Sequence, residues 1–556
     1  MFVRTREREN GKVTILIVEN LRSGGKVQQK TVRTLATVLP EEVEQFKELA
    51  EHIKAQMEVD LEPNLFPAPT LADMVINSRI RSLTDDSPIP VNLVKLREES
   101  RIVTGIHEIY GSLFDEIGFG TVFKNCPVSR AVMKDIVMAR LSKPCSKRSS
   151  IELLERDFGI KVALEKVYRM MDTLTDCRIK RLQDIAWHHS RGLLTEEIKL
   201  LFYDCTTLYF ESFIEDELRS FGYSKDHKFN QGQVLLALIV TREGLPVGYE
   251  VFPGNMYEGD TFKYAIEKIK NRYRVKRAIV VADSGLLSKP NIELLEKEKF
   301  EFILGARLKS LSKKWQDMIL DNTEYEKIEK NKEVLRIANY LYSKNRRLIV
   351  SHSSFRAEKN RKDREKAIEK LRQKLDKSKR PESLISNYGY KKYLTVEGNV
   401  QVKVNEEKLE KETLWDGLHG VFTNIEEKDM SSKEILSQYH GLWQVEESFR
   451  ISKHDLRVRP IFHWSPKRIQ AHMAICFVAF SLIRFLQHRL KYKRKENFSA
   501  ERIRDELYRI QDSIVRNRTN YERYVIPSKP SQDAIKIYDA MNRIRHVIPF
   551  KLSAKL

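Results

Sequence analysis

The sequence is short of cysteine and of long apolar runs. Its five cysteines are scattered, odd in number and without any Cys-x-x-Cys spacing, so neither a disulfide framework nor a zinc knuckle is indicated. The longest nearly apolar run, Met473 to Ile483, is too short to span a bilayer and predicts a buried helix. The first ten residues contain no apolar signal-peptide region, so we expect a cytoplasmic protein without a membrane partner.

Positive charge is what the sequence has in excess. It contains 99 Lys and Arg against 78 Asp and Glu among 556 residues, a formal net charge of +21. Such an excess favours a polyanionic partner, and nucleic acid fits this role. Apolar residues make up 41% of the chain, which is enough for a sizeable core, and the length indicates several domains.

Residues 1–90 predict a small N-terminal domain. Alternating apolar positions with turn signals at 10–11 and 24–25 indicate a three-stranded β-meander. Pro40 then opens a predicted helix, and the proline-rich stretch 63–90 is typical of a linker.

Residues 91–196 have helical spacing, and we expect them to form a DNA-binding domain. Two predicted helices flank a short turn at Gly159, which is the order of a helix-turn-helix motif. The second helix is predicted to carry Lys161, Lys166 and Arg169 outward and to bury Val167, Met170 and Leu174. Two packed helices with no role in DNA binding would give the same pattern, so both interpretations remain.

Residues 197–307 change to the pattern of a sheet. Three apolar, β-branched or aromatic segments at 200–212, 232–241 and 245–255 predict neighbouring strands. A helix around Thr261 to Tyr273 and a strand at 277–283 follow. The resulting β-β-β-α-β order is the start of a ribonuclease H-like sheet.

The remaining chain predicts three further regions. Residues 308–412 mix short strands with a charged helix at 355–380, whose narrow apolar stripe indicates a mostly solvated helix, with DNA contact as the alternative. Residues 413–495 return to a core strand followed by helices. Residues 496–556 are charged, and we expect them to be mostly helical.

Three carboxylates stand out as candidates for chemistry. Asp204 lies inside an apolar strand, where an acid is costly unless it is paired or coordinates a metal. Asp283 ends the next predicted strand after a helix, and strand ends of an α/β sheet are where ligands gather. Glu446 lies on a predicted helix, with Glu447 as the competing acid. A surface carboxylate or a helix salt bridge would explain each acid alone. Because all three acids occur at positions suited to a metal site, together they favour a single site.

The residues around Glu446 resemble a known signature. Tyr439, Leu442, Glu446 and Lys453 match three of four positions of the pattern Tyr-(2)-Arg-(3)-Glu-(6)-Lys. Together with YDCTTLYFES, VVADSGL and RPIFHWSPKRIQAH, this resembles the DDE transposases of the insertion sequence four superfamily and its relatives over roughly residues 200–490. Leu442 replaces the family's arginine and removes its phosphate contact, and Arg450 is the candidate replacement.

The resemblance implies the fold class. It predicts an α/β ribonuclease H-like catalytic core, with its first half at 197–307 and its second half at 413–495. A β-rich insertion domain would occupy 308–412, because the gap between Asp283 and Glu446 is too long for an undecorated core. The N-terminal β-meander, the helical DNA-binding region and a helical C-terminal tail at 496–556 would complete the chain.

The resemblance also implies a site. Asp204, Asp283 and Glu446 would hold two Mg²⁺ or Mn²⁺ ions per active site, which agrees with the preference of carboxylates for hard ions. Tyr439 and Lys453 would contact the DNA backbone near the cleaved bond. Trp443 would stack on a base. The alternative interpretation is that Trp443 packs between helix and sheet.

The expected function is DNA transposition. We expect the protein to bind the terminal inverted repeats of its mobile element, cleave the ends, and join the 3′-hydroxyls to double-stranded target DNA. Assembly on two ends implies at least a homodimer, acting at the nucleoid of a prokaryote. A ribonuclease H-like nuclease without strand transfer, and a catalytically silent DNA-binding protein derived from a transposase, are the alternatives.

Overall fold

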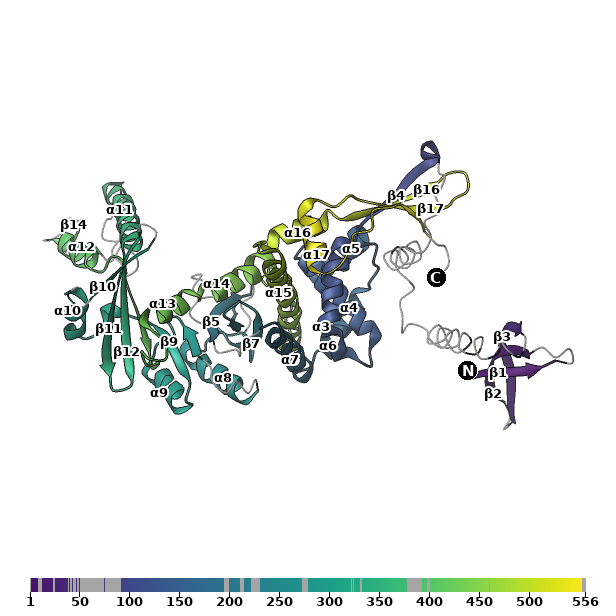
Figure 1. The fold of residues 1–556 in the computed structure, drawn as a ribbon, viewed down its shortest axis with the longest axis horizontal. Helices are drawn as coiled ribbons and strands as arrows, with labels where there is room; N and C mark the ends of the chain where they lie inside the picture. Colours follow the sequence, from purple (N-terminus) through teal and green to yellow (C-terminus); the bar gives the residue numbers. More distant parts are fainter. Residues whose placement is uncertain are drawn as a thin grey trace. The chain divides into compact units, whose positions relative to one another are not determined.

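The computed structural model divides the chain into two compact units, which are described separately (Figure 1). Unit 1 comprises Met1–Thr173 and Arg504–Leu556, and unit 2 comprises Leu174–Ile503. Apart from single positions, the structure describes residues 2–8, 13–23, 26–38, 92–194, 200–210, 215–221, 231–272, 279–321, 325–330, 333–377, 393–397, 401–459 and 461–552.

The N-terminal strands of unit 1 form a sheet of their own. Strands β1 (Phe2–Glu7), β2 (Val13–Ser23) and β3 (Lys26–Val38) pair antiparallel in chain order. Ile15 and Val38 are buried, as the alternation of apolar residues predicts. The predicted meander is therefore confirmed, while its two turns and nearly all of residues 39–91 lie outside the described residues.

The rest of unit 1 joins helices to a four-stranded sheet built from both ends of the chain. The helices are α3 (Ser112–Ile117), α4 (Pro127–Ser142), α5 (Lys147–Phe158), α6 (Leu164–Thr173) and α17 (Gln532–Ala540). The sheet has the order β18 (Phe550–Lys551), β17 (Arg523–Pro527), β16 (Gln511–Asn517) and β4 (Leu96–Val103).

This sheet corrects two expectations. The C-terminal region was predicted to be mostly helical, but it contains three strands, because β16 pairs antiparallel with β4 from the other end of the chain. For the same reason the region 91–196 is not wholly helical. Local spacing could not reveal a strand whose partner lies several hundred residues away. The unit boundary falls within α16 (Ala500–Tyr508).

Arg545 links the two chain segments of unit 1, Met1–Thr173 and Arg504–Leu556, through hydrogen bonds. Its guanidinium donates to Glu108 at 2.7 Å, to Thr104 Oγ1 at 3.1 Å and to the backbone oxygen of Gln511 at 3.3 Å. It also forms a buried ion pair with Asp512, which is fully buried. This pairing allows a charged side chain to lie in the core.

A nine-stranded sheet organises unit 2. Its order is β10 (Glu326–Lys330), β11 (Glu333–Ser343), β12 (Arg346–Ser353), β15 (Leu418–Thr423), β9 (Glu301–Ala306), β8 (Ile279–Ala282), β5 (Leu200–Tyr209), β6 (Gln233–Thr241) and β7 (Pro246–Pro253). The pairs β5–β8 and β8–β9 are parallel, and all other pairs are antiparallel. The predicted β-β-β-α-β order is confirmed by β5, β6, β7, α8 (Glu258–Asn271) and β8.

Helices cover both faces of this sheet. One face carries the main core cluster, including Tyr203, Ala237 and Val280, and it packs on α8, α9 (Lys289–Lys297) and α10 (Lys313–Leu320). The opposite face meets α13 (Ser432–His440), α14 (Trp443–Arg450) and α15 (Pro466–Arg494). Helix α7 (Asp176–Leu193) packs against β7 and α15.

The stretch expected to form a separate insertion domain is divided in the structure. Strands β10 to β12 extend the large sheet, because β12 pairs with β15 and β15 pairs with β9. Only β13 (Leu394–Glu397) and β14 (Gln401–Val404) form a separate ribbon, which packs with the charged helix α11 (Ser354–Lys377) and near α12 (Glu406–Thr413). The stripe of α11 is narrow as predicted, since only Ile368 and Leu371 are buried.

Helix α15 contains the apolar run noted in the sequence. By length and composition alone this helix could cross a membrane, but 94% of its most apolar 18-residue window is buried inside the protein. Phe477 and Phe480 are among its buried residues, and Phe477 contacts Tyr249 of β7. These are the surroundings of a core helix, as the sequence predicts.

The buried pair in unit 1 gives a stability prediction. Arg545→Met should remove the guanidinium group that pairs with the buried Asp512 carboxylate and lower the free energy of unfolding by about 3–5 kcal/mol. Urea unfolding followed by circular dichroism measures this change. Arg543→Met is the matched control, since Arg543 is exposed nearby, and it should change stability by less than about 0.5 kcal/mol. Equal stability of the two variants would contradict the assignment.

Candidate active site

Asp204 and Asp283 lie at matching positions of adjacent parallel strands. The parallel register pairs Phe202 of β5 with Val281 of β8, and each aspartate follows two residues later. Paired strands lie about 4.8 Å apart, so the same register brings the two aspartates side by side. Their neighbours in the chain, such as Tyr203 and Ala282, belong to the core of the opposite face. Both carboxylates therefore point toward the face that carries α13 and α14.

The main chain holds one oxygen of each aspartate. Asp204 Oδ1 accepts the backbone N–H of Cys205 at 2.7 Å, and Asp283 Oδ1 accepts that of Gly285 at 2.8 Å. The second contact is an Asx turn, which begins as the chain leaves β8. Asp204 is half-buried and Asp283 is exposed. The remaining carboxylate oxygens are accordingly oriented by contacts that do not require a ligand.

Glu446 lies on the helix that covers these strands. Helix α13 begins with a capping box between Ser431 and Glu434, and α14 follows it after Gly441. A Cβ at Gly441 would be only 2.7 Å from Cζ of Phe202, so the junction of the two helices rests directly on β5. Helix α14 contacts β5 and β6, and Glu446 is exposed in its first turn.

Tyr439 lies between α13 and the strand ends. A Cβ at Gly305 of β9 would be 2.3 Å from the Tyr439 hydroxyl oxygen and 2.9 Å from the backbone nitrogen of Ser284. Only a residue without a side chain leaves room for Tyr439 at this point. The hydroxyl therefore lies beside the turn that carries Asp283.

The charges of all three candidate acids affect the pKa of Tyr439. The pKa of the Tyr439 phenol is raised to about 12, mainly by burial, with the charges of Asp283, Glu446 and Asp204 contributing and that of Arg356 opposing them. A phenolate is disfavoured near carboxylates because like charges repel. Tyr439 is thus within electrostatic reach of each candidate acid.

The three candidate carboxylates are suitable ligands for a hard divalent ion, but they do not converge on one point. Among the described residues, no three Asp, Glu, His or Cys side chains are close enough together to hold a metal ion. Carboxylates repel one another, so three of them remain apart unless a cation lies between them. The oxygen ligands present are those that Mg²⁺ and Mn²⁺ prefer.

The neighbours of Glu446 are engaged elsewhere. Arg450 donates to both oxygens of Glu447, at 2.7 and 2.6 Å, and this pairing lowers the pKa of the Glu447 carboxyl. Arg450 also lies 3.4 Å from Asp455. Leu442 is 8% exposed and is part of the core. Neither Arg450 nor Leu442 presents an unpaired cation to a ligand.

Trp443 and Lys453 occupy different surroundings. Trp443 is 56% exposed and lies at a cavity of about 730 Å³ that is also lined by Tyr492, His488 and Lys495. The alternative prediction of a tryptophan packed between helix and sheet does not fit this exposure. Lys453 is half-buried in the π-helical turn Ile451–Asp455 that follows α14.

The helix pair predicted in the N-terminal half is present in unit 1. Helices α5 and α6 flank Gly159, whose φ is +67°, and Val167, Met170 and Leu174 are buried as expected. Lys161 is not on the second helix, which begins only at Leu164. Lys161 pairs with Glu155 at 3.2 Å and Arg169 pairs with Glu165, whereas Lys166 is half-buried.

Sequence reasoning missed several residues around Tyr439. Gly305 carried a usable signal, since a glycine inside a buried strand often marks a close approach. The ring of His419 in β15 packs against that of Tyr439, with centroids 4.9 Å apart and a tilt of 40°, and no sequence pattern points to it. Arg356, which acts on the Tyr439 phenol, lies in the helix that the sequence marks only as charged.

Comparison with known proteins identifies two family models. The model described as Transposase DDE domain matches residues 195–482, about half of the chain. The model described as IS1634 family transposase, N-terminal domain matches residues 2–63. No curated protein matches the sequence.

Two solved transposase structures match the chain with low scores. A piggyBac transposase synaptic complex with hairpin DNA matches with a TM-score of 0.36 and 10% identity, over 67% of this chain and 68% of that one. A Mos1 transposase paired-end complex with left transposon end matches with a TM-score of 0.15 and 11% identity, over 45% and 70%. At TM-scores this low, neither likeness adds to the family match.

The electrostatics of Tyr439 give a first prediction for the site. The difference between alkaline titrations of the wild type and Tyr439→Phe, followed by phenolate absorbance, should have a midpoint near pH 12. In an Asp283→Asn background the midpoint should fall, yet stay above 10, because burial remains. The raised pKa means that Tyr439 stabilises the fold fully below pH 10 and that this contribution is lost as pH rises toward 12. An unchanged midpoint would contradict the proximity of Asp283.

The fit of Tyr439 over β9 gives a second prediction. Gly305→Ala should destabilise the protein by about 1–3 kcal/mol, because the new methyl group overlaps the Tyr439 hydroxyl. The loss should be smaller in a Tyr439→Phe background, and a double-mutant cycle measured by urea unfolding quantifies this coupling. Gly192→Ala is the control, since nothing lies within 4 Å of its added Cβ. Additive effects of the two substitutions would refute the contact.

Proposed function

The chain belongs to the insertion-sequence DDE transposases, and from this premise we propose that it cuts the ends of its own mobile element and joins them to target DNA. In this proposal the protein binds the terminal inverted repeats, cleaves the ends, and transfers the 3′-hydroxyls by cut-and-paste chemistry. The main support is the placement of Asp204 and Asp283 at matching positions of parallel strands, beneath the helix that carries Glu446.

The topology of unit 2 supports a ribonuclease H-like core. Within the large sheet, the order β7-β6-β5-β8-β9 places three antiparallel strands beside two parallel ones, with α8 connecting β7 to β8. In this proposal the core is completed by α13 and α14, and the segment from β10 to α12 is an insertion that extends the sheet.

Glu446 is proposed as the third acid in preference to Glu447. Both oxygens of Glu447 accept hydrogen bonds from Arg450, from its Nε and one of its terminal nitrogens, which leaves Glu447 poorly placed to bind anything else. Glu446 is exposed, and its charge acts on Tyr439 together with those of the two aspartates. Electrostatic proximity to the same phenol is the support for grouping the three.

The proposed chemistry is an in-line displacement at phosphorus. Two Mg²⁺ or Mn²⁺ ions bound by the three carboxylates would supply an activated water or 3′-hydroxyl and a stabilised leaving oxygen. The backbone contacts of Asp204 and Asp283 orient the two carboxylates for this role. The Tyr439 phenol is protonated at neutral pH, as any tyrosine is, so its hydroxyl can donate a hydrogen bond to a DNA phosphate.

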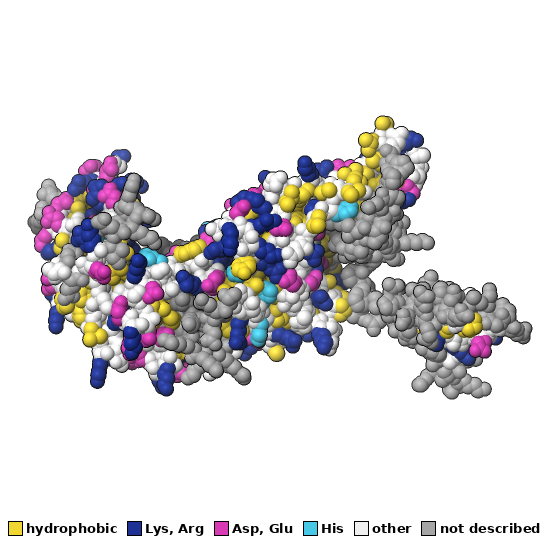
Figure 2. Space-filling view, in the orientation of Figure 1, with side chains coloured by type: hydrophobic (Ala, Val, Ile, Leu, Met, Phe, Trp, Pro, Cys, Tyr) yellow, Lys and Arg dark blue, Asp and Glu magenta, His cyan; other side chains and the backbone are white. Residues whose placement is uncertain are grey.

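Further DNA contacts are proposed around the acids. Trp443 and Tyr492 expose aromatic rings at one cavity with Lys491 and Lys495, a combination suited to stacking a base beside a phosphate. Figure 2 shows Lys and Arg side chains over the region of α14 and α15. Lys453 is proposed as a phosphate contact, and Arg450 only if it leaves Glu447.

The remaining partners are proposals as well. Lys161, Lys166 and Arg169 of unit 1 would contact DNA through the α5–α6 pair. Two element ends require two active sites, so the assembled complex would contain at least a homodimer. A chromosomal substrate implies action in the cytoplasm, at the nucleoid of a prokaryote.

The test uses the purified full-length chain and a duplex taken from the inverted repeats that flank its gene. With Mg²⁺ the wild type should nick this duplex and join it to a second DNA. Asp204→Asn, Asp283→Asn and Glu446→Gln should each lower both rates by about a thousandfold or more while DNA binding persists. Glu447→Gln is the control and should stay within about tenfold of the wild type.

Each outcome distinguishes a different function. Cleavage without joining would favour a nuclease that lacks strand transfer. Binding without cleavage by the wild type would favour a silent DNA-binding protein, an alternative supported only by the apolar Leu442. Full activity of the three acid variants would refute the proposed site.

A further inference from the structure

A cluster of positive charge lies on the other side of Tyr439 from the acids. The His419 ring packs against the Tyr439 ring at a tilt of 40°, and its Nε2 is buried without a hydrogen-bond partner among the described residues. Burial lowers the pKa of His419 to about 4, with Arg356 and His440 contributing, so the imidazole is neutral at physiological pH. His419 therefore contributes a ring and a hydrogen-bonding nitrogen, and the charge of the cluster comes from arginines.

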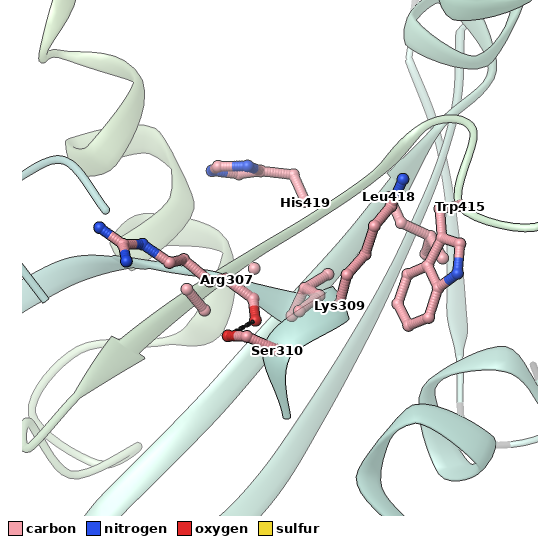
Figure 3. Close-up of a pocket in the computed structure, with 9 residues that line it drawn as sticks. Arg307, Lys309, Ser310, Trp415, Leu418 and His419 are labelled. Carbon is pink, nitrogen blue, oxygen red and sulfur yellow. Dashed lines mark hydrogen bonds between the residues drawn. The ribbon is translucent and has the colours of Figure 1, made fainter. Parts of the chain in front are cut away.

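Arg307 reaches this cluster from β9. It follows the strand two positions after Gly305, so alternation directs it to the same face as Tyr439. Arg307 and His419 line one cavity of about 430 Å³, and the described residues that line it include no Asp or Glu. In Figure 3, Arg307 and His419 extend to the same side of that cavity, whereas Lys309 and Trp415 lie on the other. Lys309 is already paired with Glu412.

Arg356 reaches the cluster from α11. The helix begins directly after β12, whose Ser351 lies opposite His419 in the sheet. The Asn360 side chain accepts the backbone N–H of Gly417 at 3.2 Å, and a Cβ at Gly417 would be 2.9 Å from that of Ala357. The first turns of α11 thus lie against residues 417–419, and the charge of Arg356 acts on both His419 and Tyr439.

The two arginines differ from their neighbours in having no carboxylate. Both are exposed, and within the described part of the chain no hydrogen bond or ion pair involves either guanidinium group. By contrast, Arg361 of the same helix bonds Glu358 and Glu365, and Arg364 bonds Asp416. Arg307 and Arg356 are therefore free to bind an external anion.

We propose that Arg307 and Arg356 form a phosphate clamp that holds the DNA backbone on the His419 side of Tyr439. This inference rests on the proposed function and extends it. A phosphodiester approaching three carboxylates is repelled, so nearby cations must neutralise the backbone that leads to the scissile bond. Leu442 cannot do so, and Arg450 is occupied by Glu447. Paired guanidinium groups beside a hydroxyl donor suit phosphate oxygens.

The salt dependence of DNA binding measures how many phosphate contacts the protein makes. Arg307→Gln, Arg356→Gln and the double variant are compared with the wild type on a terminal-repeat duplex and on an unrelated duplex of equal length, with Ca²⁺ replacing Mg²⁺. For each lost phosphate contact, the slope of log Kobs against log salt should fall by about 0.9 in magnitude. For the double variant, the magnitude of the slope should fall by about twice as much as for a single variant. Arg356→Lys should retain the wild-type slope because it keeps the charge.

Arg361→Gln is the matched control, since it makes the same substitution on the same helix at an arginine already paired with two acids. It should leave the slope unchanged. A loss seen only with the terminal-repeat duplex assigns the clamp to the element end, and a loss seen only with the unrelated duplex assigns it to target DNA. Wild-type slopes for the double variant on both duplexes would overturn the clamp. A wild type that binds but never cuts in Mg²⁺ would instead refute the proposed function.

Discussion

Asp204 and Asp283 are far apart in the chain and meet because β5 and β8 pair in parallel within one sheet. Two carboxylates side by side repel each other, which destabilises the folded state. The strands that carry them are nevertheless held in place by packing on their other face. Leu201, Tyr203 and Val280 bury the opposite face of the same strands in the main core cluster. The position of the acids is thus fixed by packing that does not involve them, which is how a strained electrostatic arrangement persists in a folded protein.

Tyr439 divides the charges of the site into two groups. The acids lie toward the ends of β5 and β8, and the exposed arginines lie toward β15 and the start of α11. Gly305 makes this division sterically feasible, because a side chain there would occupy the place of the hydroxyl. A substrate with a charged backbone could be attracted by one group and cut at the other. The insertion between Asp283 and Glu446 would then have a direct role, since it carries Arg356.

Much of the core could be predicted from the sequence because its signals are local. Alternation and β-branched residues mark β5 to β8, and an acid within or after such a strand is conspicuous. Partners distant in sequence could not be predicted. Strands β16 and β17 could not be recognised, because local spacing does not reveal that β16 pairs with the distant β4 as well as with β17. Lys161 lies outside the second helix, which begins only at Leu164. His419 and Arg356 become meaningful only when β12 and β15 lie side by side.

The central claim is that Asp204, Asp283 and Glu446 bind the same pair of divalent ions. Anomalous diffraction at the manganese edge, from crystals of the protein with Mn²⁺ and terminal-repeat DNA, tests it most directly. We expect two manganese peaks, with oxygens of all three carboxylates at roughly 2.0–2.2 Å from them. Manganese bound by the aspartates alone, with Glu446 directed to solvent or replaced by Glu447, would contradict it.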